Sequence, residues 1–141
     1  MPEAFGRRFL VLTIAMVALV GFAVAQGALE TQLATAKQHA EFSMGAEEHE
    51  MAVRHLGHVL NCIAGEGGEG FDGSWGHPCG GQGAGILADI EEHAHAADLM
   101  AVLSSAHALA MQGVAEESLG AVHAAAAGVR ALLEVLSGFG G

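Results

Sequence analysis

Four stretches of the chain repeat apolar residues at the three- and four-residue spacing of an amphipathic helix. They run from Leu29 to Met44, from Ala46 to about Cys62, from Ala88 to Gln112, and from about Glu116 towards the C-terminus. The last stretch has a regular stripe made of Leu119, Val122, Ala126, Val129, Leu133 and Leu136. Gly45 and Gly113 are expected to end the first and third helices. We therefore predict an all-α protein, an antiparallel four-helix bundle of two helical hairpins.

The first 25 residues precede these helices and have the pattern of a secretory signal peptide. Two arginines come before an apolar run from Phe9 to Phe22, and the tripeptide Ala-Val-Ala that ends at Ala25 is a cleavage site of the A-x-A type. The apolar stretch is at the lower limit for a membrane-spanning helix. We therefore predict a signal peptide over 1–25 and a mature periplasmic or secreted protein over 26–141. The alternative is a retained membrane anchor, with the bundle facing the periplasm.

A glycine-rich segment, 64–87, separates the two predicted hairpins, and ten glycines fall between Gly65 and Gly85. Such a density of glycine predicts a loop without helices or strands. Cys62 and Cys79 flank most of this loop, and an exported protein with two cysteines is expected to pair them. In the loop-entropy model this disulfide contributes about 3 kcal/mol. We expect Phe71 and Trp75 to anchor the loop against the helices.

Composition adds a strong acidic balance and an excess of histidine. The 141 residues carry 5 Lys+Arg against 16 Asp+Glu, a formal net charge of −11. So acidic a chain is repelled by phosphate backbones, and we expect no nucleic-acid partner. There are nine histidines, more than all the basic residues together. Because imidazole is the commonest metal-ligating side chain, this excess suggests metal binding.

The predicted second helix carries Met51, His55, His58 and Cys62 at spacings of one helical turn, which let side chains share one ion. Their stripe lies opposite the apolar stripe of the helix, so we expect it to face outward or to lie beneath the glycine-rich loop. Soft histidine and methionine ligands favour copper, and another divalent transition metal is the alternative. The candidate metal ligands are His55, His58, His39, His107, His123 and Met51.

A second interpretation combines His58, Cys62, His77 and Cys79 into a zinc site. The usual C-x₂₋₄-C half-site is absent, and export favours oxidised cysteines, so the disulfide is preferred. Other chemistry has less support. A di-iron bundle needs two Glu-x-x-His helices, and neither a second such helix nor a nucleophile elbow is evident in the sequence. We therefore expect a protein that is not an enzyme.

Residues 55–85 resemble a group of small exported bacterial helical proteins that share the pattern H-L-x-H-x-x-N-C…G-x-x-G-x-x-F-D…N-P-C-x-G-x-G-x-G. Here the pattern begins at His55 and passes through Asn61-Cys62 and Pro78-Cys79, while His77 stands where it has asparagine. No function is established for that group. The two hairpins, with their His-Ala pairs and glycine turns, more loosely resemble periplasmic small metal-binding proteins. These are four-helix bundles that take up copper and other divalent ions, and the resemblance implies metal binding.

Together these observations predict an exported helical bundle that binds transition-metal ions, copper above others, through histidines. It would act as a buffer or carrier. The alternative is a structural or interaction subunit of an envelope complex, with no metal role. The expected partners are metal ions and, in the alternative, an envelope protein, with membrane contact only if the N-terminal segment is retained.

Overall fold

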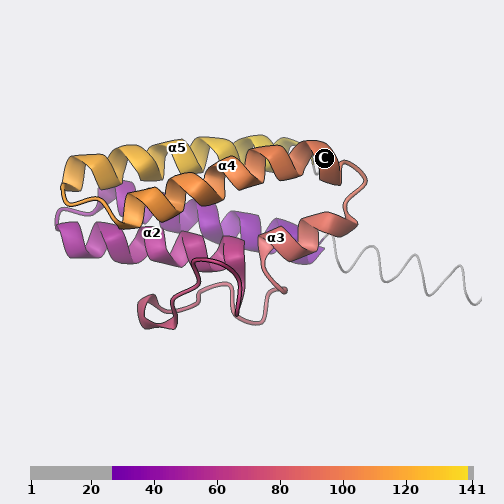
Figure 1. Ribbon diagram of the computed structural model, residues 1–141, viewed down its shortest axis with the longest axis horizontal. Helices are drawn as coiled ribbons and strands as arrows, with labels where there is room; N and C mark the ends of the chain where they lie inside the picture. Colours follow the sequence, from indigo (N-terminus) through magenta and orange to yellow (C-terminus); the bar gives the residue numbers. More distant parts are fainter. Residues whose placement is uncertain (1–26, 140–141) are drawn as a thin grey trace, which may run out of the picture.

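A computed structural model describes residues 27–139, and every regular element in that part of the chain is helical (Figure 1). The predicted signal peptide, 1–25, lies outside the described residues. A helix over 27–45 comes first. It is followed by α2 (His49–Ala64), α3 (Ile86–Asp89), α4 (Ala96–Val114) and α5 (Leu119–Gly138), with short 3₁₀ turns at Gly73–Trp75 and Ile90–Glu92. The predicted all-α class is therefore confirmed for this part of the protein.

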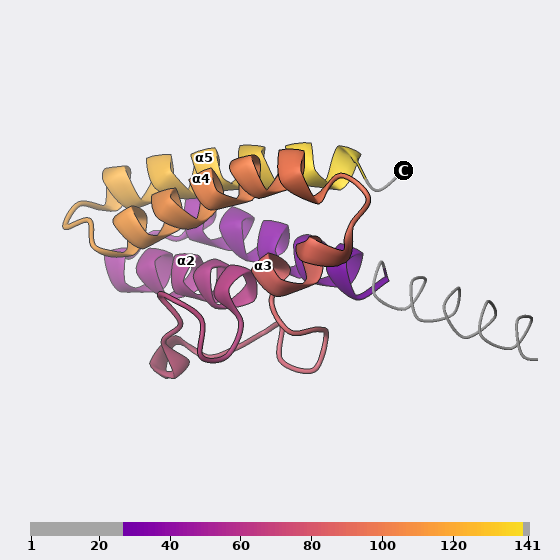
Figure 2. The ribbon, with the colours of Figure 1, turned by 45° about the vertical axis from the view of Figure 1, so that its right-hand side comes forward.

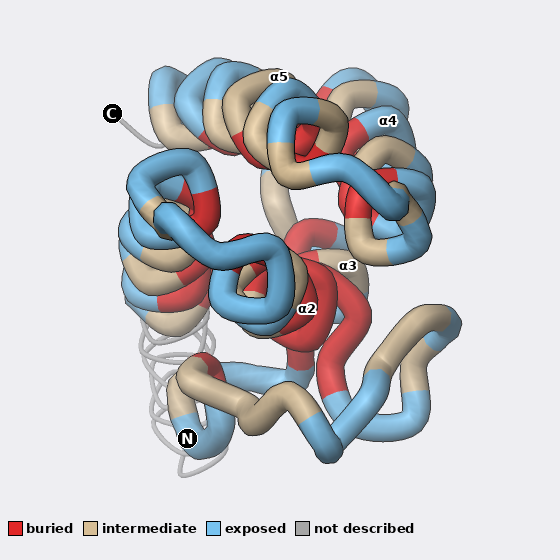
Figure 3. The backbone as a smooth tube through the Cα atoms, turned by 90° about the vertical axis from the view of Figure 1, so that its left-hand side faces the viewer, coloured by how far each residue is buried: buried red, intermediate tan, exposed pale blue. Residues whose placement is uncertain are grey.

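The long helices lie side by side as a helical bundle, while the glycine-rich loop hangs beneath α2 (Figures 1 and 2). α4 packs most extensively against α5, and α2 contacts both. Viewed from the end, the buried parts of the helices turn towards one another (Figure 3). Many of the fully buried positions are alanines, whose small side chains allow close helix approach: Ala36, Ala40, Ala52, Ala106, Ala110 and Ala126.

The stripe predicted for the last helix faces the core, since Val122, Val129 and Leu133 are fully buried. Ser118 begins this helix, because its Oγ accepts a hydrogen bond from the Ala121 backbone N–H at 3.2 Å. Gly113 does not end α4 as predicted, because the helix continues to Val114. A Cβ at Gly113 would overlap neighbouring side chains of α2 and α5, so this glycine serves close helix packing.

The predicted single helix from Ala88 to Gln112 is wrong. The chain instead forms α3 and the 3₁₀ turn, and it leaves helical geometry at His93 (φ −77°, ψ 145°) before α4 begins. Ile86 and Ile90, one turn apart, are both fully buried. Burying these two side chains turns α3 away from the line of α4. The alanine and acidic residues between 88 and 98 favour a continuous helix locally, but the burial of Ile86 and Ile90 in the tertiary structure outweighs that preference.

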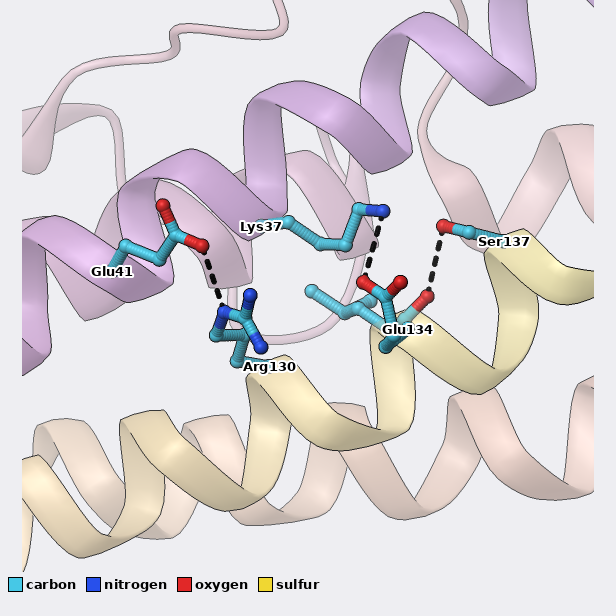
Figure 4. A network of polar contacts seen from close by, with 6 residues as sticks. Lys37, Glu41, Arg130, Glu134 and Ser137 are labelled. Carbon is cyan, nitrogen blue, oxygen red and sulfur yellow. Dashed lines mark hydrogen bonds and ion pairs between the residues drawn. The ribbon is translucent and has the colours of Figure 1, made fainter.

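α5 is, among the described helices, the one long and apolar enough to cross a membrane by length and composition, with a mean hydropathy of 1.5. In the structure its buried stripe packs within the bundle. Its outer side carries Arg130, which pairs with Glu41 at 2.8 Å, and Glu134, which pairs with Lys37 at 3.1 Å (Figure 4). Surface pairs of this kind add little stability, but they join α5 to the N-terminal helix.

The predicted disulfide between Cys62 and Cys79 is present, with an S–S length of 2.00 Å. It joins the last turn of α2 to the far side of the glycine-rich loop. The loop contains one short 3₁₀ turn, Gly73–Trp75, which the sequence did not predict. Its far end is held by buried Gln32, whose Oε1 accepts from the Gly85 backbone N–H at 3.0 Å and whose Nε2 donates to Asp89 at 2.6 Å. The loop is therefore pinned at both ends against the helices.

Candidate metal centre

Three histidines from two helices converge where the N-terminal helix packs beside α2. The Nδ1 atom of His39 lies 3.2 Å from Nδ1 of His55 and 3.1 Å from Nδ1 of His58. One ring nitrogen from each residue lies within 4.8 Å of the others, and all three residues are half-buried. In the described part of the chain, no other group of three His, Cys, Asp or Glu side chains meets this condition.

The local sequence explains this convergence. His55 and His58 are three residues apart on α2, so their side chains share one helix face. His39 precedes Ala40, which is fully buried, and this position places the His39 ring at the edge of the helix interface. The three rings come together because α2 and the N-terminal helix pack closely through small side chains.

The nitrogen spacing suits a transition metal. Four-coordinate zinc has metal–nitrogen bonds of about 2.0–2.1 Å, which separate two ligating nitrogens by roughly 3.3–3.4 Å in a tetrahedron. The two Nδ1–Nδ1 distances to His39, 3.2 and 3.1 Å, are only slightly shorter. Small movements of the rings would therefore open a position for an ion between the three nitrogens.

A backbone carbonyl sets the orientation of one ligand. Nε2 of His58 lies 2.5 Å from the Trp75 carbonyl oxygen. A carbonyl can only accept, so Nε2 carries the proton and donates it. In the neutral ring, Nδ1 of His58 then presents a lone pair to the cluster. This is the usual supporting arrangement of metal-ligating histidines, in which a second hydrogen bond sets the tautomer and the ring plane.

The glycine-rich loop delivers that carbonyl because a residue of α2 holds the loop by hydrogen bonds. Asn61 is fully buried, and its Nδ2 donates to the carbonyl oxygens of Asp72 at 2.8 Å and Gly76 at 2.7 Å. Its Oδ1 accepts from the Asp72 backbone N–H at 2.9 Å. The Trp75 ring lies so close to Gly57 that a Cβ there would overlap the indole. Asn61 and Gly57 therefore position the carbonyl that orients His58.

Burial and mutual repulsion lower the pKa values of two of the three histidines. The pKa of His39 is lowered from 6.5 to about 4, first by burial and then by the charges of His58 and His55. The pKa of His55 is also lowered, first by burial and then by the charges of His58 and Arg54. At neutral pH these two rings are therefore unprotonated, so protons do not compete with an ion for their lone pairs.

The other predicted ligands lie apart from this cluster. Nε2 of His107 donates to the Glu69 carbonyl oxygen at 2.8 Å, and Nε2 of His123 donates to the Ala46 carbonyl oxygen at 3.0 Å. Both rings therefore join loops or turns to helices. Met51 is exposed on α2, one turn before His55, and lines the same groove as His55. The structure thus brings together three of the six candidates and leaves a fourth beside them.

The alternative zinc site is wrong, because Cys62 and Cys79 are bonded to each other and have no thiolate to offer. His77 packs against Phe71 with ring centroids 5.2 Å apart. Trp75 does anchor the loop, since its ring packs against the core, while Phe71 is half-buried.

Sequence reasoning did not find the supporting roles of Gly57, Asn61 and the Trp75 carbonyl. Two of these residues, Gly57 and Asn61, lie with His58 and Cys62 in one run of α2. Each of the four acts on the loop that covers the site. This group of α2 residues was the available signal in the sequence, but the role of each residue depends on which loop atoms pack against it.

No protein-family model, curated protein or solved structure matches this chain. The functional argument therefore depends on the geometry of the site.

Proposed function

We propose that this protein is an exported buffer or carrier of transition-metal ions, with copper as the favoured ion, and that His39, His55 and His58 hold the ion. The bundle that carries the site would be an antiparallel arrangement of two helical hairpins. The convergence of the three Nδ1 atoms supports the proposal most directly.

Four further features support it. The Trp75 carbonyl holds His58 in the tautomer that leaves Nδ1 free to ligate. The lowered pKa values of His39 and His55 keep both rings ready to bind at neutral pH. The negative charge of the chain raises the local concentration of cations. The Cys62–Cys79 disulfide is in keeping with an oxidising, exported environment.

We infer a carrier in preference to an enzyme from the composition of the cluster. Among the described residues it consists of three imidazoles, which offer one ion a set of nitrogen ligands. Neutral ligands that bind and release an ion suffice for a buffer.

The test is elemental analysis and metal titration of the protein expressed from its full sequence without a histidine tag. We expect one tightly bound ion per chain, lost in the His55→Ala/His58→Ala double variant. A His93→Ala/His95→Ala double variant, which removes two histidines outside the cluster, should keep the ion. Equal binding by both variants, or equal loss in both, would refute the proposal.

One observation favours the alternative, a subunit of an envelope complex. Val135 and Phe139, at the end of α5, are exposed apolar side chains, 49% and 47% accessible. Isolated apolar residues on a surface are common, so this is weaker support than the histidine cluster. A protein that binds no ion above the control variant, and that is recovered from its native envelope in a stoichiometric complex, would favour this function.

A further inference from the structure

The three histidines leave a tetrahedral ion one ligand short, and their surroundings differ on the two sides. On one side the glycine-rich loop covers the site. There the Trp75 carbonyl accepts from His58, and a Cβ at Gly76 would lie 3.2 Å from His58 Nε2. An ion cannot pass through this side without displacing the loop, which Asn61 and the disulfide hold in place.

The other side is open. A groove of about 460 Å³ runs along the seam between the N-terminal helix and α2, and His55 forms part of its wall. Phe42 and Met51 line it together with the acidic residues Glu41, Glu47 and Glu48. Of the three histidines, only His55 lines the groove, so the cluster meets the groove at His55.

Met51 offers a soft thioether at this opening. It lies four residues before His55, on the same face of α2, and its side chain is 40% exposed. It is outside the buried core, so packing does not account for a methionine here. Its flexible chain has three rotatable bonds, which allow the thioether to turn towards a neighbouring ligand.

Phe42 makes the immediate surroundings of the cluster less polar. Its ring centroid lies 5.5 Å from that of His39, in an edge-on arrangement, and 5.4 Å from that of His55. Three imidazoles, one thioether and an aromatic ring form a soft set of groups around the site. Thioethers favour Cu(I), whereas Zn(II) has no need of one. The nearby charged groups are Arg54 next to His55, Glu47 and Glu48 in the groove wall, and Glu41, which already pairs with Arg130.

We propose that Met51 supplies the fourth ligand of the histidine site and makes it selective for Cu(I), and that the ion enters and leaves through the groove beside His55. This inference rests on the proposed function, and it adds the oxidation state and the route. The ion is taken up as Cu(I) and released as Cu(I), so the step is a ligand exchange without electron transfer. The Cys62–Cys79 disulfide is unchanged throughout.

The test compares Met51→Leu with Met44→Leu. Met44 is a second exposed methionine, 39% accessible, that does not line the groove. Protein expressed from the full untagged sequence is titrated anaerobically with Cu(I) against a chromogenic Cu(I) chelator, and separately with Zn(II) against a zinc chelator. Ascorbate serves as the reductant, because a thiol would open the disulfide and create new ligands.

We expect Met51→Leu to weaken Cu(I) binding about 10-fold or more and to leave Zn(II) binding within about twofold, in line with the loss of one supporting ligand. Met44→Leu should change neither affinity. X-ray absorption of the Cu(I) protein should show a sulfur neighbour that is absent in Met51→Leu. Both variants keep an apolar side chain of similar volume, so unfolding is not expected to obscure the result.

Two results would overturn the inference: unchanged Cu(I) affinity in Met51→Leu, or equal weakening of Cu(I) and Zn(II). The His55→Ala/His58→Ala variant separates this failure from failure of the proposed function. If that variant loses the ion while Met51→Leu keeps full Cu(I) affinity, the histidine site stands and the role of Met51 is refuted. If it binds ions as well as the unaltered protein, both proposals are refuted.

Discussion

The metal-free protein should lose stability as the pH falls from about 6.5 to about 4, and His39 should cause part of that loss. In the unfolded chain the His39 imidazole has its ordinary pKa of 6.5, whereas in the folded protein burial, together with the charges of His58 and His55, lowers the pKa to about 4. Between these values the unfolded state binds a proton that the folded state does not bind. The stability is therefore fully present above pH 6.5 and declines as the pH approaches 4.

The size of the effect follows from the shift. Without screening, a change from 6.5 to about 4 would correspond to roughly 3 kcal/mol, because each pKa unit is about 1.4 kcal/mol. His39 is only half-buried, and solvent screens its interactions with His55 and His58. We therefore expect His39 to contribute about 1–2 kcal/mol to the pH dependence.

Urea unfolding of chelator-treated protein at about pH 7.5 and about pH 4.5 measures this contribution. The difference in unfolding free energy between the two pH values should be about 1–2 kcal/mol smaller in His39→Asn, because the proton taken up by His39 on unfolding is removed. His95→Asn is the matched control, because His95 is exposed and lies outside the cluster. The same pH dependence in His39→Asn as in the unaltered protein would refute the reasoning.

Two further predictions concern the loop that covers the site. Asn61→Ala removes three hydrogen bonds from a buried position, so it should lower the unfolding free energy, measured in urea, by about 2–3 kcal/mol. It should also weaken metal binding, because the loop carbonyl that orients His58 is no longer held. An unchanged urea midpoint would contradict the role of Asn61 in holding the loop. Gly57→Ala should displace the ring of Trp75, the single tryptophan, and shift its fluorescence to the red. Gly120→Ala is its control, because a Cβ there meets nothing within 4 Å; it should leave the emission unchanged and raise stability by up to about 1 kcal/mol. Equal emission spectra in the two glycine variants would refute the contact.

The sequence was informative wherever structure depends on neighbours along the chain. The period of Val122, Val129 and Leu133 reports which face of α5 is buried, because helical geometry alone sets that face. The two cysteines of a chain predicted to be exported could be paired, since the sequence has no third cysteine. The stripe of His55 and His58 was likewise visible, because residues three apart on a helix point the same way.

Errors arose where distant groups compete with local preference. The segment after Ala88 has good helix formers, yet the burial of Ile86 and Ile90 breaks it before α4. Gly113 has the appearance of a helix stop, but it is a contact point between helices. In both cases the deciding atoms belong to other segments, and their positions are not encoded in the local pattern.

The candidate metal centre shows the same contrast between what the local pattern predicts and what tertiary packing decides. Spacing along the chain identified His55 and His58 as a pair, but it could not choose a third ligand among His39, His107 and His123. Tertiary packing decided that question, because it placed Nδ1 of His39 within 3.2 Å of the pair and turned the other two rings towards backbone carbonyls. Periodicity determines which face of a helix a side chain occupies, whereas the meeting of two faces depends on how closely the helices pack.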